Sequence, residues 1–429
     1  MATATDPEVN GAADARSKPP FLRRVRIRGY KSIAFCDVAL EPLTVLVGRN
    51  ASGKSNFLDA LGFLRNLLRL GASEAAKIHG GIEAILCRVA TDRTIAFEIE
   101  CNSTHTESDD AFEAAYAIEI EFPQKQRPQI RGESLRIANA IGDQMGYSYS
   151  NGSVECFASG DRAVKWEWEA SVYPFLVRYH NELRAEQTPW ILDGITSLSI
   201  HNFQPSEIRQ LQHPYPGNLL NQNGANLASV IEATRENDWD AFERVRRYLH
   251  VITKTVELRG LIKYGADYET VRFQVSRDSH GQPLDFDAAS MSDGTLRVLA
   301  ALVAAFQVVP VRGSPSLVAI EEPETSLHPA AMHALVDALD EATLRTQILL
   351  TTHSAEMLDN PTIRPENIRV VQMIDGRTVI APVDAASVEI VKRRLNTLGG
   401  LERDNLLEAD PDDVERQQQL EAASAEPPK

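Results

Sequence analysis

The chain has 429 residues, 43% of them apolar, and a formal net charge of −16. This apolar fraction excludes a globally disordered chain, and the length predicts one large domain with insertions or two to three smaller domains. The acidic balance argues against a protein coated in nucleic acid, although it is compatible with a local basic face.

The setting follows from the cysteines and from the apolar segments. No secretion signal follows the initiating methionine, and the longest nearly apolar stretch, residues 298–311, is shorter than the ~20 residues that a membrane span needs. We therefore expect a cytoplasmic protein without a membrane partner. Its thiols are expected to be unpaired because no Cys-x-x-Cys pair occurs among Cys36, Cys87, Cys101 and Cys156.

The first half of the chain predicts mostly strands. Residues 1–20 are small and polar and predict a disordered N-terminus, whereas residues 25–47 predict two or three strands. Residues 53–70 place apolar side chains at helical spacing. Strict alternation of apolar and polar residues predicts half-buried antiparallel strands at 94–100, 116–122 and 164–169.

The second half changes character. Residues 225–250 predict a helix, and alternation returns at 270–276. From residue 294 onward helices and strands alternate, which is typical of a parallel sheet with crossover helices. The last stretch, 408–429, holds seven acidic and two basic residues and predicts a solvated tail or a frayed helix.

A phosphate-binding motif stands at the start of the first long helix. "LTVLVGRNASGKSNFLDAL", residues 43–61, fits G-x-x-x-x-G-K-[ST] with Gly48, Gly53, Lys54 and Ser55. The glycines let backbone N–H groups point at phosphate oxygens, the lysine reaches the terminal phosphates, and the serine hydroxyl ligates Mg²⁺. The alternative is a glycine-rich turn with an incidental Lys-Ser, which the flanking strand and helix disfavour.

Two carboxylates follow a predicted buried strand in "SLVAIEEPETSLHP", residues 316–329. Ligands and metals gather at the carboxyl ends of strands in open α/β sheets. Glu321 is expected to hold the Mg²⁺ shell, and Glu322 to orient or deprotonate the attacking water. An acidic loop after a core strand is the alternative.

Two further motifs have polar groups at a helix start and at a strand end. Ser292, Asp293, Gly294 and Thr295 open an apolar helix, where they either bind a γ-phosphate or cap the helix. His353 follows the apolar strand of "TQILLTTHSAEML" and can hydrogen-bond a γ-phosphate or the attacking water. A lone histidine is more often a core residue, but its position after the second sheet strand favours the site.

The order of these motifs resembles that of the ABC-type ATPases of the SMC, RecF and OLD-like branch, and more closely that of the bacterial AAA-type (RecF-like) ATPases within it. "VRIRGYKSI" (25–33) resembles their first strand, "SDGTLR" their signature, "EEPETSLHP" their extended Walker B and D-loop, and "TLGGLERDNLL" (397–407) a late segment. The likeness spans roughly residues 21–407, and its specific motifs occupy four short islands.

This resemblance implies an α/β fold, a P-loop NTPase built as an ABC-type ATPase head. An antiparallel β-rich lobe and an α+β insertion between Walker A and the signature are expected to accompany it. The implied segments are a disordered N-terminus (1–20), the N-terminal head with Walker A (21–93), an inserted β-rich and helical region (94–285), the C-terminal head (286–407) and an acidic tail (408–429).

The resemblance also assigns roles. It implies ATP and Mg²⁺ as ligands, and a homodimer in which the signature, Ser292 to Thr295, contacts the nucleotide held by the other protomer. Ser55 and Glu321 would hold the metal, Glu322, His353 and Lys54 would be catalytic, and residues 326–328 would be the D-loop. The implied Walker A contacts are Gly48, Arg49, Asn50, Ala51, Ser52, Gly53, Lys54, Ser55 and Asn56.

Two departures from the family pattern stand out. Glu321 occupies a position that is usually Asp, and the glutamine that usually completes the Mg²⁺ shell is absent from "HGGIEAIL", residues 79–86, where it might be expected. For the adenine contact, Tyr30 is a candidate, with a core position as the alternative.

The sequence supports two functional hypotheses. In the first, the chain is an ATPase that converts ATP and water to ADP and phosphate, closes as a dimer, and couples nucleotide state to DNA or to a partner in DNA repair or anti-phage defence. In the second, it is a slow or non-hydrolysing nucleotide-gated scaffold that regulates a separately encoded effector such as a nuclease. A transporter ATPase subunit is disfavoured because the insertion is long and strand-rich.

Two basic runs motivate DNA as a partner, with a solvated surface as the alternative in each case. The first lies on a predicted strand, where alternate residues share a face, and comprises Arg23, Arg24, Arg26, Arg28 and Lys31. The second lies on a predicted helix and comprises Arg244, Arg246 and Arg247.

Overall fold

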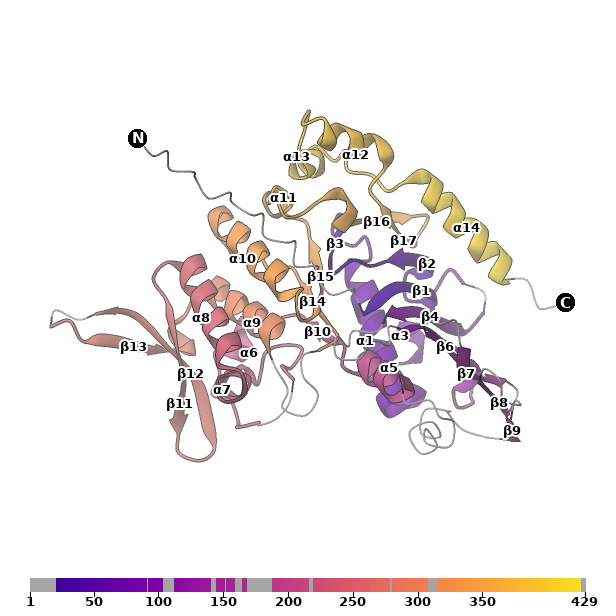
Figure 1. Ribbon diagram of the computed structural model, residues 1–429, viewed down its shortest axis with the longest axis horizontal. Helices are drawn as coiled ribbons and strands as arrows, with labels where there is room; N and C mark the ends of the chain where they lie inside the picture. Colours follow the sequence, from indigo (N-terminus) through magenta and orange to yellow (C-terminus); the bar gives the residue numbers. More distant parts are fainter. Residues whose placement is uncertain are drawn as a thin grey trace, which may run out of the picture.

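The computed structural model describes residues 21–90, 92–102, 112–139, 144–150, 152–158, 164–167, 187–215, 219–277, 280–307 and 315–425. The expected disordered N-terminus lies outside these residues. The described part is a mixed α/β fold in which a central sheet separates a large antiparallel sheet from a helical region (Figure 1).

A six-stranded sheet forms the centre, with the strand order β10-β14-β15-β3-β16-β17. Five of its strands run parallel and only β17 is antiparallel, as the alternation of helices and strands predicted. Every residue of β3 and β15 is buried, as expected for strands covered on both faces. The strands are β3 (Leu43–Val47), β10 (Ser199–His201), β14 (Leu317–Glu321), β15 (Gln347–Thr352), β16 (Ile368–Ile374) and β17 (Arg377–Pro382).

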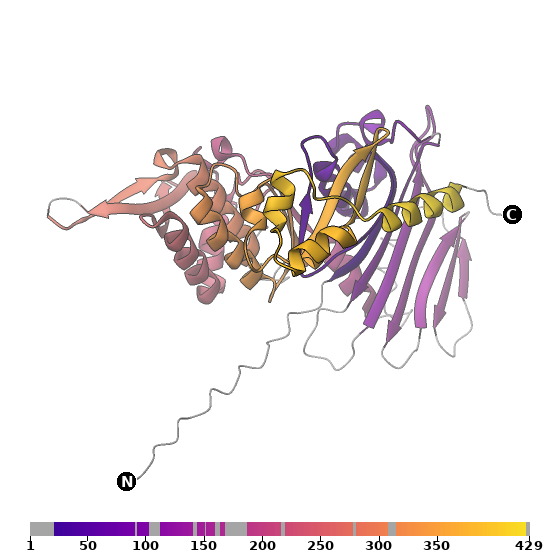
Figure 2. The ribbon, with the colours of Figure 1, turned by 90° about the horizontal axis from the view of Figure 1, so that it is seen from above.

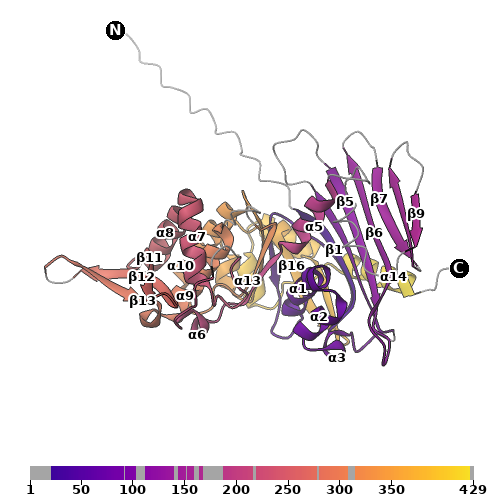
Figure 3. The same ribbon diagram turned by 90° about the horizontal axis from the view of Figure 1, so that it is seen from below.

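Helices cover both faces of this sheet (Figures 1 and 3). Side chains alternate along β3, so Val45 and Val47 enter one core while Leu46 enters the other. One face carries α1 (Lys54–Leu70) and α5 (Gln187–Thr196). The opposite face carries α7 (Leu227–Asn237), α8 (Trp239–Thr253), α9 (Asp293–Phe306) and α10 (Pro329–Ala342).

An eight-stranded antiparallel sheet, ordered β2-β1-β4-β5-β6-β7-β8-β9, packs its buried face against α1 and α5. Because β4 pairs with β1, the sheet crosses the expected segment boundary between residues 93 and 94. The alternating segments at 94–100 and 116–122 are strands as predicted, and 164–169 is a strand over its described part. The strands are β1 (Leu22–Tyr30), β2 (Ile33–Ala39), β4 (Thr94–Asn102), β5 (Phe112–Glu121), β6 (Gln129–Asn139), β7 (Gln144–Ser150), β8 (Ser153–Ala158) and β9 (Val164–Glu167).

A three-stranded sheet projects at the other end of the molecule (Figure 2). It consists of β11 (Glu257–Tyr264), β12 (Tyr268–Arg277) and β13 (Pro283–Asp287). The single helix predicted over residues 225–250 is instead two helices, α7 and α8. Asp238 breaks the run because its backbone is not helical, with a φ of −146° and a ψ of 88°, and its side chain accepts a hydrogen bond from the Ala241 N–H, which caps α8.

The described part of the chain contains further helices. All four cysteines are buried and unpaired, as expected. Among the described residues, none of the helices combines the length and the apolar character that crossing a membrane requires. The remaining helices are α2 (Ala72–Ile78), α3 (Ile82–Ile85), α6 (Pro205–Ile208), α11 (Ala355–Leu358), α12 (Ala385–Lys392), α13 (Leu398–Arg403) and α14 (Pro411–Ala425).

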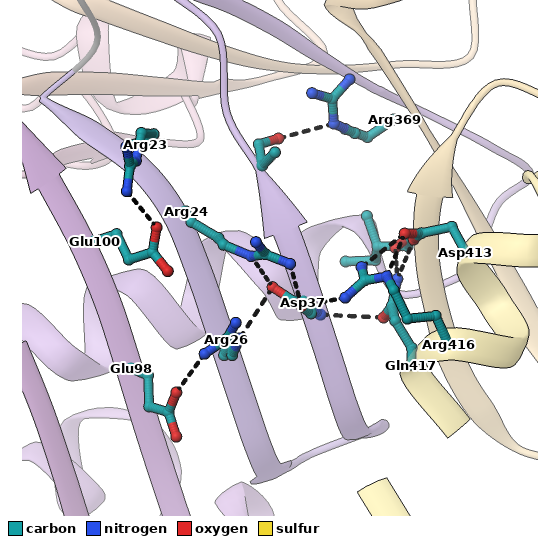
Figure 4. Close-up of polar contacts among 12 residues, drawn as sticks. Arg23, Arg24, Arg26, Asp37, Glu98, Glu100, Arg369, Asp413, Arg416 and Gln417 are labelled. Atoms are coloured by element: carbon teal, nitrogen blue, oxygen red, sulfur yellow. Dashed lines mark hydrogen bonds and ion pairs between the residues drawn. The ribbon is translucent and has the colours of Figure 1, made fainter. Parts of the chain in front are cut away.

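Of the two alternatives for residues 408–429, a solvated tail or a frayed helix, the structure shows a helix, α14, which docks on β2 and β17. Gln417 is 4% exposed; it donates to the Ile380 carbonyl at 2.9 Å and accepts from the Asp37 N–H at 3.0 Å. Arg416 forms an ion pair with Asp37 at 2.7 Å (Figure 4). The contacts are polar, so apolar periodicity gave no sign of them.

Candidate nucleotide-binding site

The loop between β3 and α1 encloses a lysine side chain. Lys54 Nζ donates to the Gly48 carbonyl at 2.5 Å and to the Arg49 carbonyl at 3.1 Å. Burial lowers the pKa of Lys54, while the nearby charges of Glu322 and Glu402 act in the opposite direction. The loop therefore holds a cation at its centre, where the motif places the terminal phosphates.

The two motif glycines are required by close packing. Gly53 has a φ of 107°, and a Cβ there would lie 1.9 Å from Thr378 Oγ1. A Cβ on Gly48 would lie 2.1 Å from the Val371 carbonyl oxygen. Thr378 Oγ1 also donates to the Ser52 carbonyl at 3.0 Å, so the hairpin of β16 and β17 supports the loop from behind.

The remaining loop residues divide between surface and interior. Arg49, Asn50 and Ala51 are exposed. Asn56 is turned away, because its amide donates to Ser32 at 2.6 Å. Ser52 Oγ is buried without a hydrogen-bond partner within the described residues, and such an orphaned hydroxyl beside the loop fits a phosphate oxygen.

The predicted metal-side pair is in contact. Ser55 Oγ donates to Glu321 Oε2 at 2.8 Å, although the two residues are far apart in sequence. Burial raises the pKa of Glu321; the Ser55 hydrogen bond opposes this, and the neighbouring charge of Glu322 adds to it. Within the described ranges, no group of three or more His, Cys, Asp or Glu side chains would hold a metal by itself. This pair therefore suits Mg²⁺, which is usually bound by one or two carboxylates together with substrate phosphates and water.

The second carboxylate faces the predicted histidine at the carboxyl ends of β14 and β15. His353 Nδ1 lies 3.2 Å from Glu322 Oε1, and both side chains are accessible, at 50% and 35% exposure. The Glu322 backbone has a φ of 42°, and its N–H donates to the Thr351 carbonyl at 3.1 Å. A non-glycine residue held in this region is strained, and such strain concentrates at functional sites.

Two carboxylates near the site were not assigned from the sequence. Glu324 is 4% exposed, accepts a hydrogen bond from Thr352, and has its pKa raised by burial. Burial also raises the pKa of Glu402, opposed by the nearby charges of Lys54 and His353. Glu402 lies in "TLGGLERDNLL", whose resemblance to the family gives no sign of a place near the phosphate loop.

The edge strand β10 brings two amide residues to the carboxyl-end edge of the central sheet. His201 pairs with Ile320 in the parallel register, so the chain after β10 leaves the sheet beside the end of β14. Asn202 and Gln204 follow there and are exposed. Residues 79–86, where the family pattern leads one to expect a glutamine, instead include α3 beside the turn after β1. β10 has only three residues and is far from Walker A in the sequence, so no sequence signal indicated that it lies beside β14.

The signature turn lies on the other face of the central sheet from α1 and against the predicted D-loop (Figure 1). Ser292 caps α9, with its Oγ accepting from the Thr295 N–H at 3.2 Å, so the capping alternative is observed. A Cβ on Gly294 would lie 2.5 Å from the Ser326 carbonyl oxygen, which places the turn against the predicted D-loop. In Figure 1, α9 and α1 cover opposite faces of the central sheet.

Tyr30 is a core residue. It is 0% exposed, its ring lies 5.3 Å from that of Phe63, and its hydroxyl donates to Asp59 at 2.6 Å. The proposed adenine contact is therefore corrected in favour of the core alternative, because a fully buried ring offers no stacking surface.

The predicted basic strand shares a face but is neutralised by carboxylates. Arg24 and Arg26 both pair with Asp37, whose side chain is 0% exposed, and Arg26 also pairs with Glu98 at 2.8 Å (Figure 4). The basic helix is neutralised too: Arg244 pairs with Glu341 at 3.0 Å.

Two protein families match the chain. The family described as "AAA ATPase domain" matches residues 21–210, and the family described as "AAA domain, putative AbiEii toxin, Type IV TA system" matches residues 175–359. Each covers less than half of the chain. The first match contains the phosphate loop, and the second contains the signature, both carboxylates and His353.

Two curated relatives are distant or partial matches. The DNA replication and repair protein RecF of Arthrobacter sp. (strain FB24) is 34% identical over 89 residues, which cover 20% of this chain and 22% of the relative. The Old nuclease of Escherichia phage P2 is 24% identical over 368 residues, covering 79% of this chain and 57% of the relative. The chain thus spans about a fifth of one relative and little more than half of the other.

Similar solved structures include SMC heads. The SMC head bound to the C-winged helix domain of ScpA has a TM-score of 0.46 at 14% identity, covering 86% of this chain and 99% of that one. The SMC head domain from Thermotoga maritima has a TM-score of 0.37 at 14% identity, covering 85% of this chain and 100% of that one.

Proposed function

Because the chain belongs to the ABC-type ATPases of the SMC, RecF and OLD branch, we propose that it binds and hydrolyses ATP as a head-to-head dimer. One observation carries this proposal. Three motifs from distant parts of the sequence meet at one edge of the central sheet, through the contacts of Ser55 with Glu321 and of Glu322 with His353. A capped surface turn or an acidic loop alone would not require this convergence.

The site residues divide the chemistry between them. Lys54 and the backbone N–H groups of the glycine loop bind the terminal phosphates, displacing the carbonyl contacts of the lysine. Ser55 and Glu321 would hold Mg²⁺, which would neutralise phosphate charge when bound. Glu322 accepts a proton from the attacking water. His353 contacts the Glu322 carboxylate and orients it.

The position of the signature supports a composite site. The turn from Ser292 to Thr295 opens α9, on the other face of the sheet from α1 (Figure 1), and Gly294 packs against Ser326 of the predicted D-loop. A second copy facing the first would supply the missing contact, with the N-terminal end of α9 directed at the γ-phosphate.

A multiple-turnover ATPase assay tests the hydrolysis. The wild-type chain is expected to release phosphate with Mg²⁺ and ATP, and Glu322→Gln to bind ATP while losing at least about a hundredfold in rate, as removal of a general base does. Arg246→Ala is a matched control, since Arg246 pairs with Glu243 on α8, away from the site. Equal rates in the wild type and Glu322→Gln would contradict the role of the glutamate.

A second candidate, the slow or non-hydrolysing scaffold, draws support from Glu321. Its side chain is one methylene longer than that of the Asp usual at this position in the family, which changes the reach of the carboxylate toward a metal. Tight ATP binding in the wild type without turnover would favour this candidate over the first.

Coupling to DNA or to a separately encoded effector is the finer part of the proposal. It is motivated by relatives named as a DNA replication and repair protein and as a nuclease. The neutralised state of Arg24, Arg26 and Arg244 argues that any DNA surface lies elsewhere on the chain. Affinity for duplex DNA that falls steeply with salt would support DNA as the partner, and no binding at low salt would remove it.

A further inference from the structure

Arg209 holds the signature turn from outside the motif. It follows α6 directly, and its guanidinium donates to the Met291 carbonyl at 2.8 Å and 3.3 Å through two nitrogens. The same group forms an ion pair with the Asp293 carboxylate. Backbone hydrogen bonding to the Pro205 carbonyl at 3.0 Å fixes the position of Arg209, and α6 packs against α9 (Figure 3).

Asp293 poses an electrostatic problem for a phosphate-binding turn. It is the first residue of α9, directly after the Ser292 cap, and its side chain is 54% exposed. A carboxylate in the first turn favours the positive end of its helix, which is the place that a phosphate from a facing protomer would need. A free Asp293 would compete with that phosphate for the helix end and would repel it.

We propose that Arg209 is a positioning residue for the composite site. It engages the Asp293 carboxylate, fixes the turn through Met291, and so leaves the backbone of Gly294 and the hydroxyl of Ser292 available to the partner's triphosphate. This inference rests on the proposed ATP-bound dimer.

The charge balance explains why the effect belongs to the closed dimer. In the open protomer Arg209 is 33% exposed and Asp293 is 54% exposed, so water screens the pair and its contribution to folding is small. In a closed interface water is excluded, and an uncompensated carboxylate beside a triphosphate becomes costly. Loss of Arg209 should therefore weaken closure without unfolding the chain.

The test uses four proteins in the Glu322→Gln background: the parent, Arg209→Ala, Asp293→Asn and the double variant. The readout is the ATP concentration that gives half-maximal dimer by light scattering. Arg209→Ala is expected to raise this concentration at least about tenfold, and the double variant to return within about threefold of the parent, since the repelling charge is then absent. Arg209→Lys keeps the charge but lacks the planar guanidinium. Its half-maximal ATP concentration is expected to lie between those of the parent and Arg209→Ala.

Nucleotide binding to the isolated protomer and the melting temperature serve as controls. Neither is expected to change in Arg209→Ala, and Arg246→Ala is expected to match the parent in every readout. A merely structural role would lower the melting temperature and would not be rescued by Asp293→Asn.

The outcomes separate the two proposals. If the parent does not dimerise with ATP, the proposed function fails and this inference fails with it. Two results with a parent that dimerises would overturn only the role of Arg209. One is an unchanged half-maximal ATP concentration in Arg209→Ala, and the other is a double variant that does not return toward the parent value.

Discussion

His201 in the edge strand β10 makes the stability of the chain depend on pH. The residue is 0% exposed; its Nδ1 lies 3.3 Å from the Asn221 carbonyl oxygen and its Nε2 lies 2.7 Å from Ser199 Oγ. The carbonyl can only accept, so Nδ1 carries the proton of a neutral ring and Nε2 accepts from the serine. Burial lowers the pKa of His201 to about 3, with the Asn221 hydrogen bond opposing this shift.

The sign and size of the effect follow from proton linkage. Because the pKa of the folded state is depressed, the unfolded chain takes up the proton first, at its ordinary pKa of about 6.5. Stability is therefore fully present above that value and falls as the pH drops toward 3, by about 1.4 kcal/mol per pH unit. Between pH 7 and pH 5 this single histidine removes about 2 kcal/mol.

Urea unfolding at pH 7 and pH 5 measures this loss against a matched variant. His201→Asn keeps an N–H that can reach the Asn221 carbonyl but has no group that titrates in this range. We expect the loss of unfolding free energy between the two pH values to be about 2 kcal/mol smaller in His201→Asn than in the wild type. His250→Asn, at an exposed position on α8, should keep the wild-type loss. Equal losses in the wild type and His201→Asn would refute the buried, neutral histidine.

Three further predictions concern the loop between β3 and α1, the C-terminal helix α14 and the segment 397–407. Gly53→Ala, whose new Cβ would lie 1.9 Å from Thr378 Oγ1, should weaken ATP binding at least about tenfold in a nucleotide titration, and unchanged affinity would argue against the packed loop. Asp37→Ala should cost about 3 kcal/mol in urea unfolding, the low end for a broken buried pair, because Arg416 and the other guanidinium groups stay partly in water; a cost under about 1 kcal/mol would argue against the cluster. Glu402→Gln should tighten ATP binding severalfold, since its carboxylate lies near the phosphate-binding lysine, and weaker binding would show that Glu402 instead supports the site.

Local signals predicted the parts of the fold that depend on local chemistry. Strict alternation identified β4 and β5, because each strand has one face in the core and one in water. Motif spacing singled out Gly53 and Lys54, which lie between β3 and the first turn of α1 as the motif predicts. The meeting of Ser55 with Glu321 was expected because parallel strands deliver their carboxyl ends to one edge.

Three other features that depend on contacts between distant segments gave no such signal. β10 has three residues, too few for periodicity, and its place beside β14 is known only from the parallel register. α14 docks through Gln417 and Arg416, polar side chains that read as solvated surface. Arg209 lies 84 residues before Asp293, so nothing in either stretch indicates the pair.

The central claim is that ATP is held between two copies of the chain. Light scattering of Glu322→Gln with Mg²⁺ and ATP tests this most directly, because the variant should trap the closed state. The prediction is a particle of about twice the 47.4 kDa chain mass that returns to a single chain when ATP is removed. A chain that stays at 47.4 kDa with saturating ATP would contradict the account.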